Sequence, residues 1–182
     1  MNRLLIFAVV ILLATLVPIQ ANPNGIHGPW VQNGCSCHGT MSQMDTVEIQ
    51  VSGLPEVYNI SERYNLTINI TGGPIESGVA YGGFNIRIDD GFLSRHENDS
   101  TIQIVQSSLE ATHTEQGNDQ RMWNLSWTAP SSDNLRISVV SYGNAVNGDN
   151  APTKDEWSIF THTIYGENWT APEDNTSFFV IV

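Results

Sequence analysis

The stretch Tyr64-Asn-Leu-Thr-Ile-Asn-Ile70 decides the fold class, because apolar and polar residues alternate along its whole length. Successive side chains of a β-strand point to opposite faces, so this alternation predicts a strand with one face on a core and the other in water. The same period of two recurs on both sides of this stretch, around residues 47–51, 84–88, 102–104, 123–127, 135–139, 159–165 and 178–182.

Segments with the chemistry of turns separate these runs. They are rich in Gly, Pro, Asn, Asp and Ser, which favour turns, and they lie at residues 53–55, 72–74, 89–91, 129–132 and 148–150. The sequence has no stretch with a sustained helical period and capping residues. We therefore predict an all-β chain, an immunoglobulin-like antiparallel β-sandwich with an irregular N-terminal leader.

The N-terminus has the order of a secretory signal peptide. Arg3 gives a positive start, residues 4–16 form an apolar run, and Ala21 is a small residue at its exit. The run is shorter than the roughly 20 residues of a membrane span, which favours cleavage over a retained anchor. We divide the chain into a signal peptide (1–21), a Cys/His-containing leader (22–45) and a sandwich domain (46–182). We expect a secreted or cell-surface protein, with membrane contact only through an anchor beyond Val182.

The composition is strongly acidic, with 19 Asp and Glu against 7 Lys and Arg and a formal net charge of −12. This charge argues against nucleic acid or an anionic lipid surface as a partner. Seven asparagines fit the Asn-x-Ser/Thr acceptor pattern, and export would make the exposed ones glycosylation sites. They are Asn59, Asn65, Asn69, Asn98, Asn124, Asn168 and Asn175.

The segment Gly34-Cys-Ser-Cys-His-Gly39 contains the only two cysteines of the chain. A cysteine pair followed directly by histidine is typical of covalent haem c attachment, in which the histidine binds the iron. Haem would then be held by Cys35, Cys37 and His38, although the usual motif has two residues between the cysteines and this one has a single serine. The second axial ligand is left open among His27, His96, His113, His162, Met41 and Met44.

Two other interpretations of the cluster stay open. In an oxidising compartment Cys35 and Cys37 would form a disulfide, whose very small ring would be strained. Alternatively, His27 and His38 would join the two thiolates in a site for a zinc or copper ion.

The rest of the chain carries weaker signals for chemistry. Oxygen atoms of the kind that bind Ca²⁺ come together in Asn144, Asn147, Asp149 and Asn150, but such residues are more often turn formers. No motif places a Ser/His/Asp set or a pair of carboxylates, so we expect no enzymatic activity.

Several motifs resemble a known family. They are the Cys-x-Cys-His leader, Val51-Ser-Gly-Leu-Pro55, Trp123-Asn-Leu-Ser-Trp-Thr-Ala-Pro130 and Tyr142-Gly-Asn-Ala-Val-Asn-Gly-Asp149. From about residue 25 to 165 the chain resembles the reelin-like domain of bacterial and archaeal surface proteins, often labelled choice-of-anchor V. The resemblance implies an exported immunoglobulin-like sandwich, usually tethered by a C-terminal sorting signal, with one covalent haem in its leader.

Two functional hypotheses follow. In the first, a haem c centre at Cys35, Cys37 and His38 serves electron transfer or redox sensing outside the cell, with a redox partner that the sequence does not name. In the second, the domain is a non-catalytic extracellular interaction or adhesion module. Its loops, such as 143–150, would bind a surface polymer, a glycan or a protein, and the cysteines would form a structural disulfide or a small metal site.

Overall fold

The computed structural model describes residues 22–31, 46–76, 78–149, 151 and 153–172. Within these residues, ten strands and three short 3₁₀ helices follow one another. The strands are β1 (Val47–Ser52), β2 (Val57–Tyr58), β3 (Arg63–Gly72), β4 (Gly82–Ile88), β5 (Phe92–Arg95), β6 (Ile102–Val105), β7 (Glu110–His113), β8 (Met122–Thr128), β9 (Arg136–Ala145) and β10 (Glu156–Gly166). The 3₁₀ helices are η1 (Gly28–Val31), η2 (Gln106–Ser108) and η3 (Glu115–Gly117).

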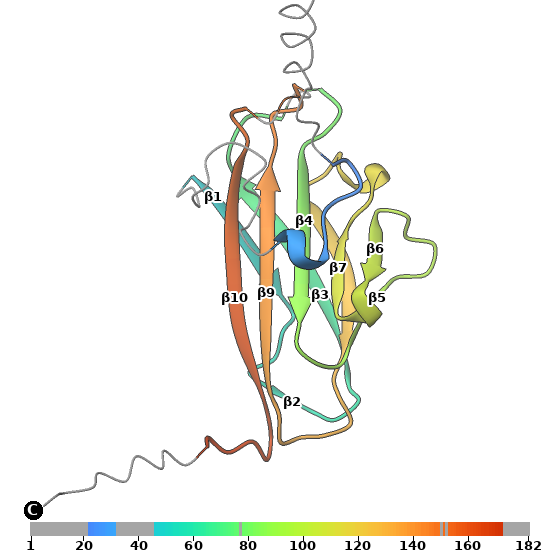
Figure 1. Ribbon diagram of the computed structural model, residues 1–182, viewed down its shortest axis with the longest axis vertical. Helices are drawn as coiled ribbons and strands as arrows, with labels where there is room; N and C mark the ends of the chain where they lie inside the picture. Colours follow the sequence, from blue (N-terminus) through green and yellow to red (C-terminus); the bar gives the residue numbers. More distant parts are fainter. Residues whose placement is uncertain (1–21, 32–45, 77, 150, 152, 173–182) are drawn as a thin grey trace, which may run out of the picture.

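The strands form two sheets packed face to face (Figure 1). One sheet has four strands in the order β1-β3-β8-β5, and the other has six in the order β2-β10-β9-β4-β7-β6. The predicted all-β sandwich is therefore confirmed. One pairing departs from the antiparallel pattern, because β2 runs parallel to β10 with Val57 opposite Tyr165.

The core lies between the two sheets and follows the predicted alternation. On β1 the residues alternate strictly between buried and exposed. Trp123 and Trp127 share one face of β8, and each is at most 1% exposed. Tyr64 stacks on Trp127 with ring centroids 5.5 Å apart, and Tyr58 meets the same ring edge-on at 5.9 Å. Burial of such large side chains supplies most of the stabilisation of a domain of this size.

The outer face of the four-stranded sheet is polar, and we call it the polar face. It carries residues with the opposite parity to the core, namely Glu48, Gln50, Ser52, Asn65, Thr67, Asn69 and Asn124. Register places Thr67 opposite Asn124, and the threonine hydroxyl donates a hydrogen bond to the asparagine Oδ1 at 2.7 Å. This face meets the expectation of one side in water.

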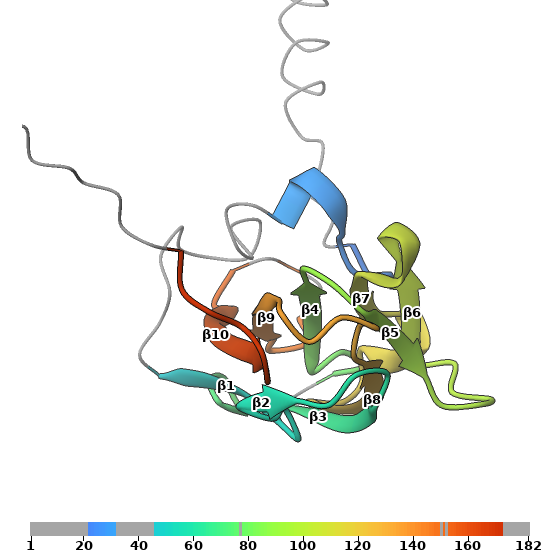
Figure 2. The same cartoon turned by 90° about the horizontal axis from the view of Figure 1, so that it is seen from below.

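The outer face of the six-stranded sheet differs, because residues 22–31 lie across it as a third layer (Figure 2). We call these residues the docked leader and this side of the sheet the covered face. Strand β4 accordingly buries six of its seven residues instead of alternating, and only Arg87 is exposed.

Three strands were not predicted from the sequence. Strand β2 has only two residues, β5 has four, and β7 has the sequence Glu-Ala-Thr-His, in which only Ala111 is apolar. Polar side chains of β7 are buried under the docked leader, so the strand has no hydrophobic alternation to detect. The predicted signal peptide and the predicted strand at residues 178–182 lie outside the described residues.

Candidate functional site

One buried carboxyl group attaches the docked leader to the covered face. Glu110 is 1% exposed, and both of its oxygens accept the backbone N–H of Gly28, at 2.9 and 3.0 Å. The side-chain nitrogen of Asn85 donates to Glu110 Oε1 at 2.7 Å and to the backbone oxygen of Ile26 at 2.9 Å. Buried polar groups are costly unless they are paired, so these bonds fix where the leader crosses the sheet.

Further contacts hold the start of the docked leader. The side chain of Gln103 donates to the backbone oxygen of Asn24, and the N–H of Glu115 donates to Asn24 Oδ1 at 3.2 Å. Gly25 has a φ of 69°, and a Cβ at this position would collide with Thr112 Oγ1. A glycine is therefore required for the close approach of leader and sheet.

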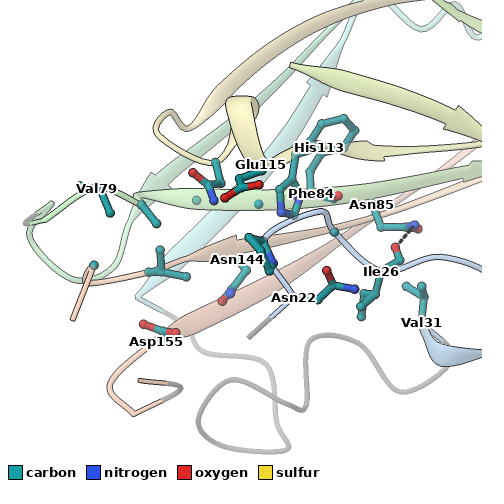
Figure 3. Close-up of a pocket in the computed structure, with 18 of the residues that line it drawn as sticks. Asn22, Ile26, Val31, Val79, Phe84, Asn85, His113, Glu115, Asn144 and Asp155 are labelled. Carbon is teal, nitrogen blue, oxygen red and sulfur yellow. Dashed lines mark hydrogen bonds between the residues drawn. The ribbon is translucent and has the colours of Figure 1, made fainter. Parts of the chain in front are cut away.

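A cavity of about 570 Å³ lies between the docked leader and the adjoining end of the sheet (Figure 3). Pockets for small molecules commonly have volumes of about 300–1,000 Å³. Its apolar walls are Ile26, Val31, Val79, Phe84 and Val146. Its polar lining includes Asn22, Asn85, His113, Glu115, Asn118, Asn144 and Asp155. Apolar walls with a few convergent polar groups are the usual character of a ligand site.

Two glycines of β4, Gly82 and Gly83, form part of the cavity wall. The imidazole of His113 lies over Gly83, where a Cβ would be 2.5 Å from His113 Cε1. The N–H of Phe84 donates to His113 Nδ1 at 3.1 Å. The same Nδ1 lies 3.3 Å from the backbone oxygen of Phe84, so it accepts from the N–H or donates to the oxygen according to the tautomer of the ring.

The loop between β9 and β10 forms one rim of the cavity, through Gly148, Ala151 and Asp155. The N–H of Ala151 donates to Asp149 at 2.8 Å, and the side-chain nitrogen of Asn147 donates to it at 3.0 Å. These two donors, the backbone N–H first, lower the pKa of Asp149 below its ordinary value of 3.8.

Arg121 ties together the loops at this end of the sandwich. Its guanidinium donates to four backbone oxygens, those of Gly72 at 2.7 Å, Pro74 at 2.8 Å, Tyr81 at 2.9 Å and Val146 at 3.3 Å. Five N–H donors in a fixed plane make arginine suited to such multiple bonding.

The predicted haem residues Cys35, Cys37 and His38 lie outside the described residues, as do Met41 and Met44. His27 lies in the docked leader and is exposed. Among the residues that the structure describes, no group of three or more His, Cys, Asp or Glu side chains is placed to bind a metal ion. The oxygen cluster proposed for Ca²⁺ is divided, because Asn144 belongs to strand β9 and lines the cavity, whereas Asp149 faces its own loop.

The described sequon asparagines are spread over both strands and loops. Asn65, Asn69 and Asn124 lie on the polar face. Asn59, Asn98 and Asn168 lie outside the strands, and Asn175 is not among the described residues. Of the six, five are exposed and Asn69 is half-buried.

Sequence reasoning missed Asn85 and Glu110 and assigned Asn144 to a turn. Asn85 lies in a run that was predicted as an ordinary half-exposed strand, and Glu110 lies in a strand that was not predicted. The pair Gly82-Gly83 was the one usable signal, because adjacent glycines in a strand often mark a close approach of a ligand or of another backbone.

No protein-family model matches the chain, and no curated protein matches its sequence. Similar solved structures include two F-spondin domains. The human F-spondin reeler domain has 13% identity and a TM-score of 0.42, and the match covers 67% of this chain and 89% of that one. The Reelin-N domain of F-spondin has 16% identity and a TM-score of 0.46, with 72% and 94% covered.

A cohesin module from a Clostridium perfringens family 33 glycoside hydrolase is also similar, with 10% identity, a TM-score of 0.42 and coverage of 68% and 98%. At such identities and TM-scores, these similarities say nothing about the function of this chain. Within the described part of the chain, no helix has the length and apolar character needed to cross a membrane.

Proposed function

We propose that this chain is an exported, non-catalytic binding module, and that its ligand occupies the cavity between the docked leader and the covered face. The observation that carries the proposal is the cavity itself, about 570 Å³ in volume, with apolar walls and buried amide side chains. Export rests on the N-terminal sequence.

The attachment of the leader supports a site that is formed before the ligand binds. Gly28, Ile26 and Asn24 each make hydrogen bonds to strands or loops of the sandwich. A preformed wall avoids the loss of conformational entropy that ordering a loop around a ligand would require. The site is therefore suited to binding without a large rearrangement.

The test is a screen of a mixed library of small neutral, cationic and anionic compounds, followed by NMR on the ¹⁵N-labelled domain. Shifts should concentrate at the amides of Gly82–Asn85 and Asn144–Val146. The variant Ala80→Phe, which fills the cavity from its edge, should weaken any hit at least tenfold, about 1.4 kcal/mol. The control is Ser131→Phe, an exposed position outside the cavity lining. Hits that bind elsewhere, or whose affinity is unchanged in Ala80→Phe, would overturn the proposal.

A second candidate is the redox module with haem c on Cys35, Cys37 and His38. It is favoured by the position of the docked leader, whose last residue, Val31, is 1% exposed and stands four residues before Cys35. His113 lines the cavity beside this leader and is the candidate for the second axial ligand.

Haem would supply a one-electron couple, with a potential set by the axial ligands and by burial. Absorption spectroscopy and intact mass should be measured on protein from a host that attaches haem c. A Soret band with haem mass retained after acid denaturation is expected for this candidate. A colourless protein of apo mass would exclude it.

A further inference from the structure

Two buried amide oxygens have no hydrogen-bond donor. Among the described residues, Asn85 Oδ1 and Asn144 Oδ1 are the buried side-chain oxygen or nitrogen atoms without a partner. The two residues are 3% and 5% exposed, and both line the cavity. A buried polar atom without a partner costs about 1–3 kcal/mol, so a pair of them in one cavity needs an explanation.

The orientation of the Asn85 amide is fixed by its neighbours. Its nitrogen donates to the backbone oxygen of Ile26 and to Glu110 Oε1, and the first bond is drawn in Figure 3. A backbone oxygen can only accept, so rotating the amide by 180° would break this bond. The oxygen of Asn85 therefore cannot exchange places with the nitrogen, and it remains an acceptor that needs a donor.

The two asparagines lie side by side on the covered face. Asn85 of β4 pairs with Tyr142 of β9, and Gly83 of β4 pairs with Asn144 of β9. Asn85 and Asn144 are thus diagonal neighbours across adjacent antiparallel strands, a relation that separates them by about 7–8 Å. One small molecule spans this distance, and it would reach the two oxygens, which are buried in this structure, once the lining shifts slightly.

The charge of the cavity lining indicates which class of ligand supplies the hydrogen-bond donors. Glu115 and Asp155 line the cavity, and no lysine or arginine is among its described lining residues. An anionic ligand would therefore meet two carboxyl groups, and the cation expected in the lining is the α-amino group of Asn22, which cleavage after Ala21 would create. A ligand with a positive charge and N–H groups meets both the acceptors and the charge.

We propose that the cavity binds a small organic ammonium ion, whose N–H groups donate to Asn85 Oδ1 and Asn144 Oδ1 and whose carbon skeleton contacts Val79 and Val146. This inference rests on the proposed function, since it names the ligand class of the same site. Asp155 and Glu115 contribute attraction for the charge and are not assigned a direct bond.

The experiment compares three probes of one size, benzylammonium, benzyl alcohol and benzoate, by NMR titration of the labelled domain. Benzylammonium should bind at least about tenfold more tightly than benzyl alcohol, and benzoate should not bind. The side-chain amide signals of Asn85 and Asn144 should shift with benzylammonium.

Variants separate the role of Asn144 from a general change in the fold. Asn144→Leu removes the acceptor and should abolish the preference for benzylammonium. Asn144→Asp keeps an acceptor of the same shape and adds a negative charge. Unlike Asn144→Leu, it should retain the preference of the parent chain for benzylammonium or strengthen it. Asn124→Leu on the polar face is the matched control and should leave binding unchanged. If Asn144→Leu does not fold, the comparison of Asn144→Asp with the parent chain still tests the inference.

The outcomes distinguish the two proposals. Binding of benzyl alcohol or benzoate in the cavity as tightly as benzylammonium would overturn the ammonium inference and leave the binding module standing. Waters alone on both amide oxygens, in a crystal structure with benzylammonium present, would also overturn it. If none of the probes or library compounds binds in the cavity, both proposals are wrong.

Discussion

The two outer faces of this sandwich, the polar face and the covered face, begin from the same strand geometry and end in opposite environments. On the polar face, Thr67 and Asn124 bond to each other in contact with water. On the covered face, Thr112 and Glu110 are at most 1% exposed, and each bonds to backbone. The comparison teaches that polar residues on an outer face do not by themselves indicate solvent, because a docked segment can cover them and, as Gly28 does for Glu110, also supply a hydrogen-bond partner.

The largest expected effect comes from Glu110→Ala. The change leaves the Gly28 N–H without its acceptor and empties a buried site, so we expect a loss of about 3 kcal/mol in the free energy of unfolding. The matched control is Glu48→Ala on the polar face, which should change stability by less than about 0.5 kcal/mol. Urea denaturation of both variants measures the contrast. Equal effects would show that the leader is not anchored by this carboxyl group.

Gly25→Ala tests the contact between the docked leader and the covered face by a change in the leader. An alanine at a φ of 69° is strained, and its methyl group would collide with Thr112 Oγ1, so we expect about 2 kcal/mol of destabilisation. Hydrogen exchange should locate the effect. The Gly28 amide should exchange faster, while the amides of β3 and β8 keep their protection. Unchanged exchange at Gly28 would contradict the docking described here.

A single substitution made on both faces sharpens the comparison further. Thr112 donates to the backbone oxygen of Phe84 at 2.6 Å and is fully buried, so Thr112→Val should cost about 1 kcal/mol. Thr67 donates to an exposed partner, and Thr67→Val should lie within about 0.5 kcal/mol of the parent. Thermal unfolding of the two variants in one buffer is sufficient. A larger loss of stability in Thr67→Val than in Thr112→Val would contradict the description of one face as exposed and the other as covered.

The smallest expected effect concerns the rim loop of the cavity. The pKa of Asp149 is lowered, first by the N–H of Ala151, so the stabilisation from its charged form is present above 3.8 and is lost as pH falls through the lowered value. The amide shift of Ala151 should therefore titrate below pH 3.8. Asp149→Asn should remove this titration, whereas the amides of the polar face should show no matching transition. A titration above 3.8 would contradict the hydrogen bonds of the loop.

The sequence predicted the strands whose side chains follow a period of two. Val47, Ile49 and Val51, and likewise Trp123 and Trp127, lie on the core as expected. Strand β7 could not be predicted in this way, because its outward residues Glu110 and Thr112 are buried by a distant segment. Burial of that kind depends on tertiary contacts that no local pattern records.

The candidate site was predictable to a smaller extent. Sequence reasoning concentrated on Cys35, Cys37 and His38, which lie outside the described residues, so the haem hypothesis stays a prediction. The cavity depends on Asn85 and Asn144, which come from adjacent strands and are separated by more than fifty residues in the chain. Only pairing of β4 with β9 brings them together, and the sequence alone does not specify which strands pair.

The hydrogen bonds of Arg121 limit how the loops at this end of the sandwich can change in length over evolution. Its guanidinium is shared by carbonyl groups from three separate segments, around residues 72–74, 81 and 146. An insertion in one segment would withdraw its carbonyl from the common donor and leave an N–H without its partner. The lengths of the loops at this end are therefore expected to change together over evolution. Among homologues, the rim of the cavity would then vary as a whole and not loop by loop.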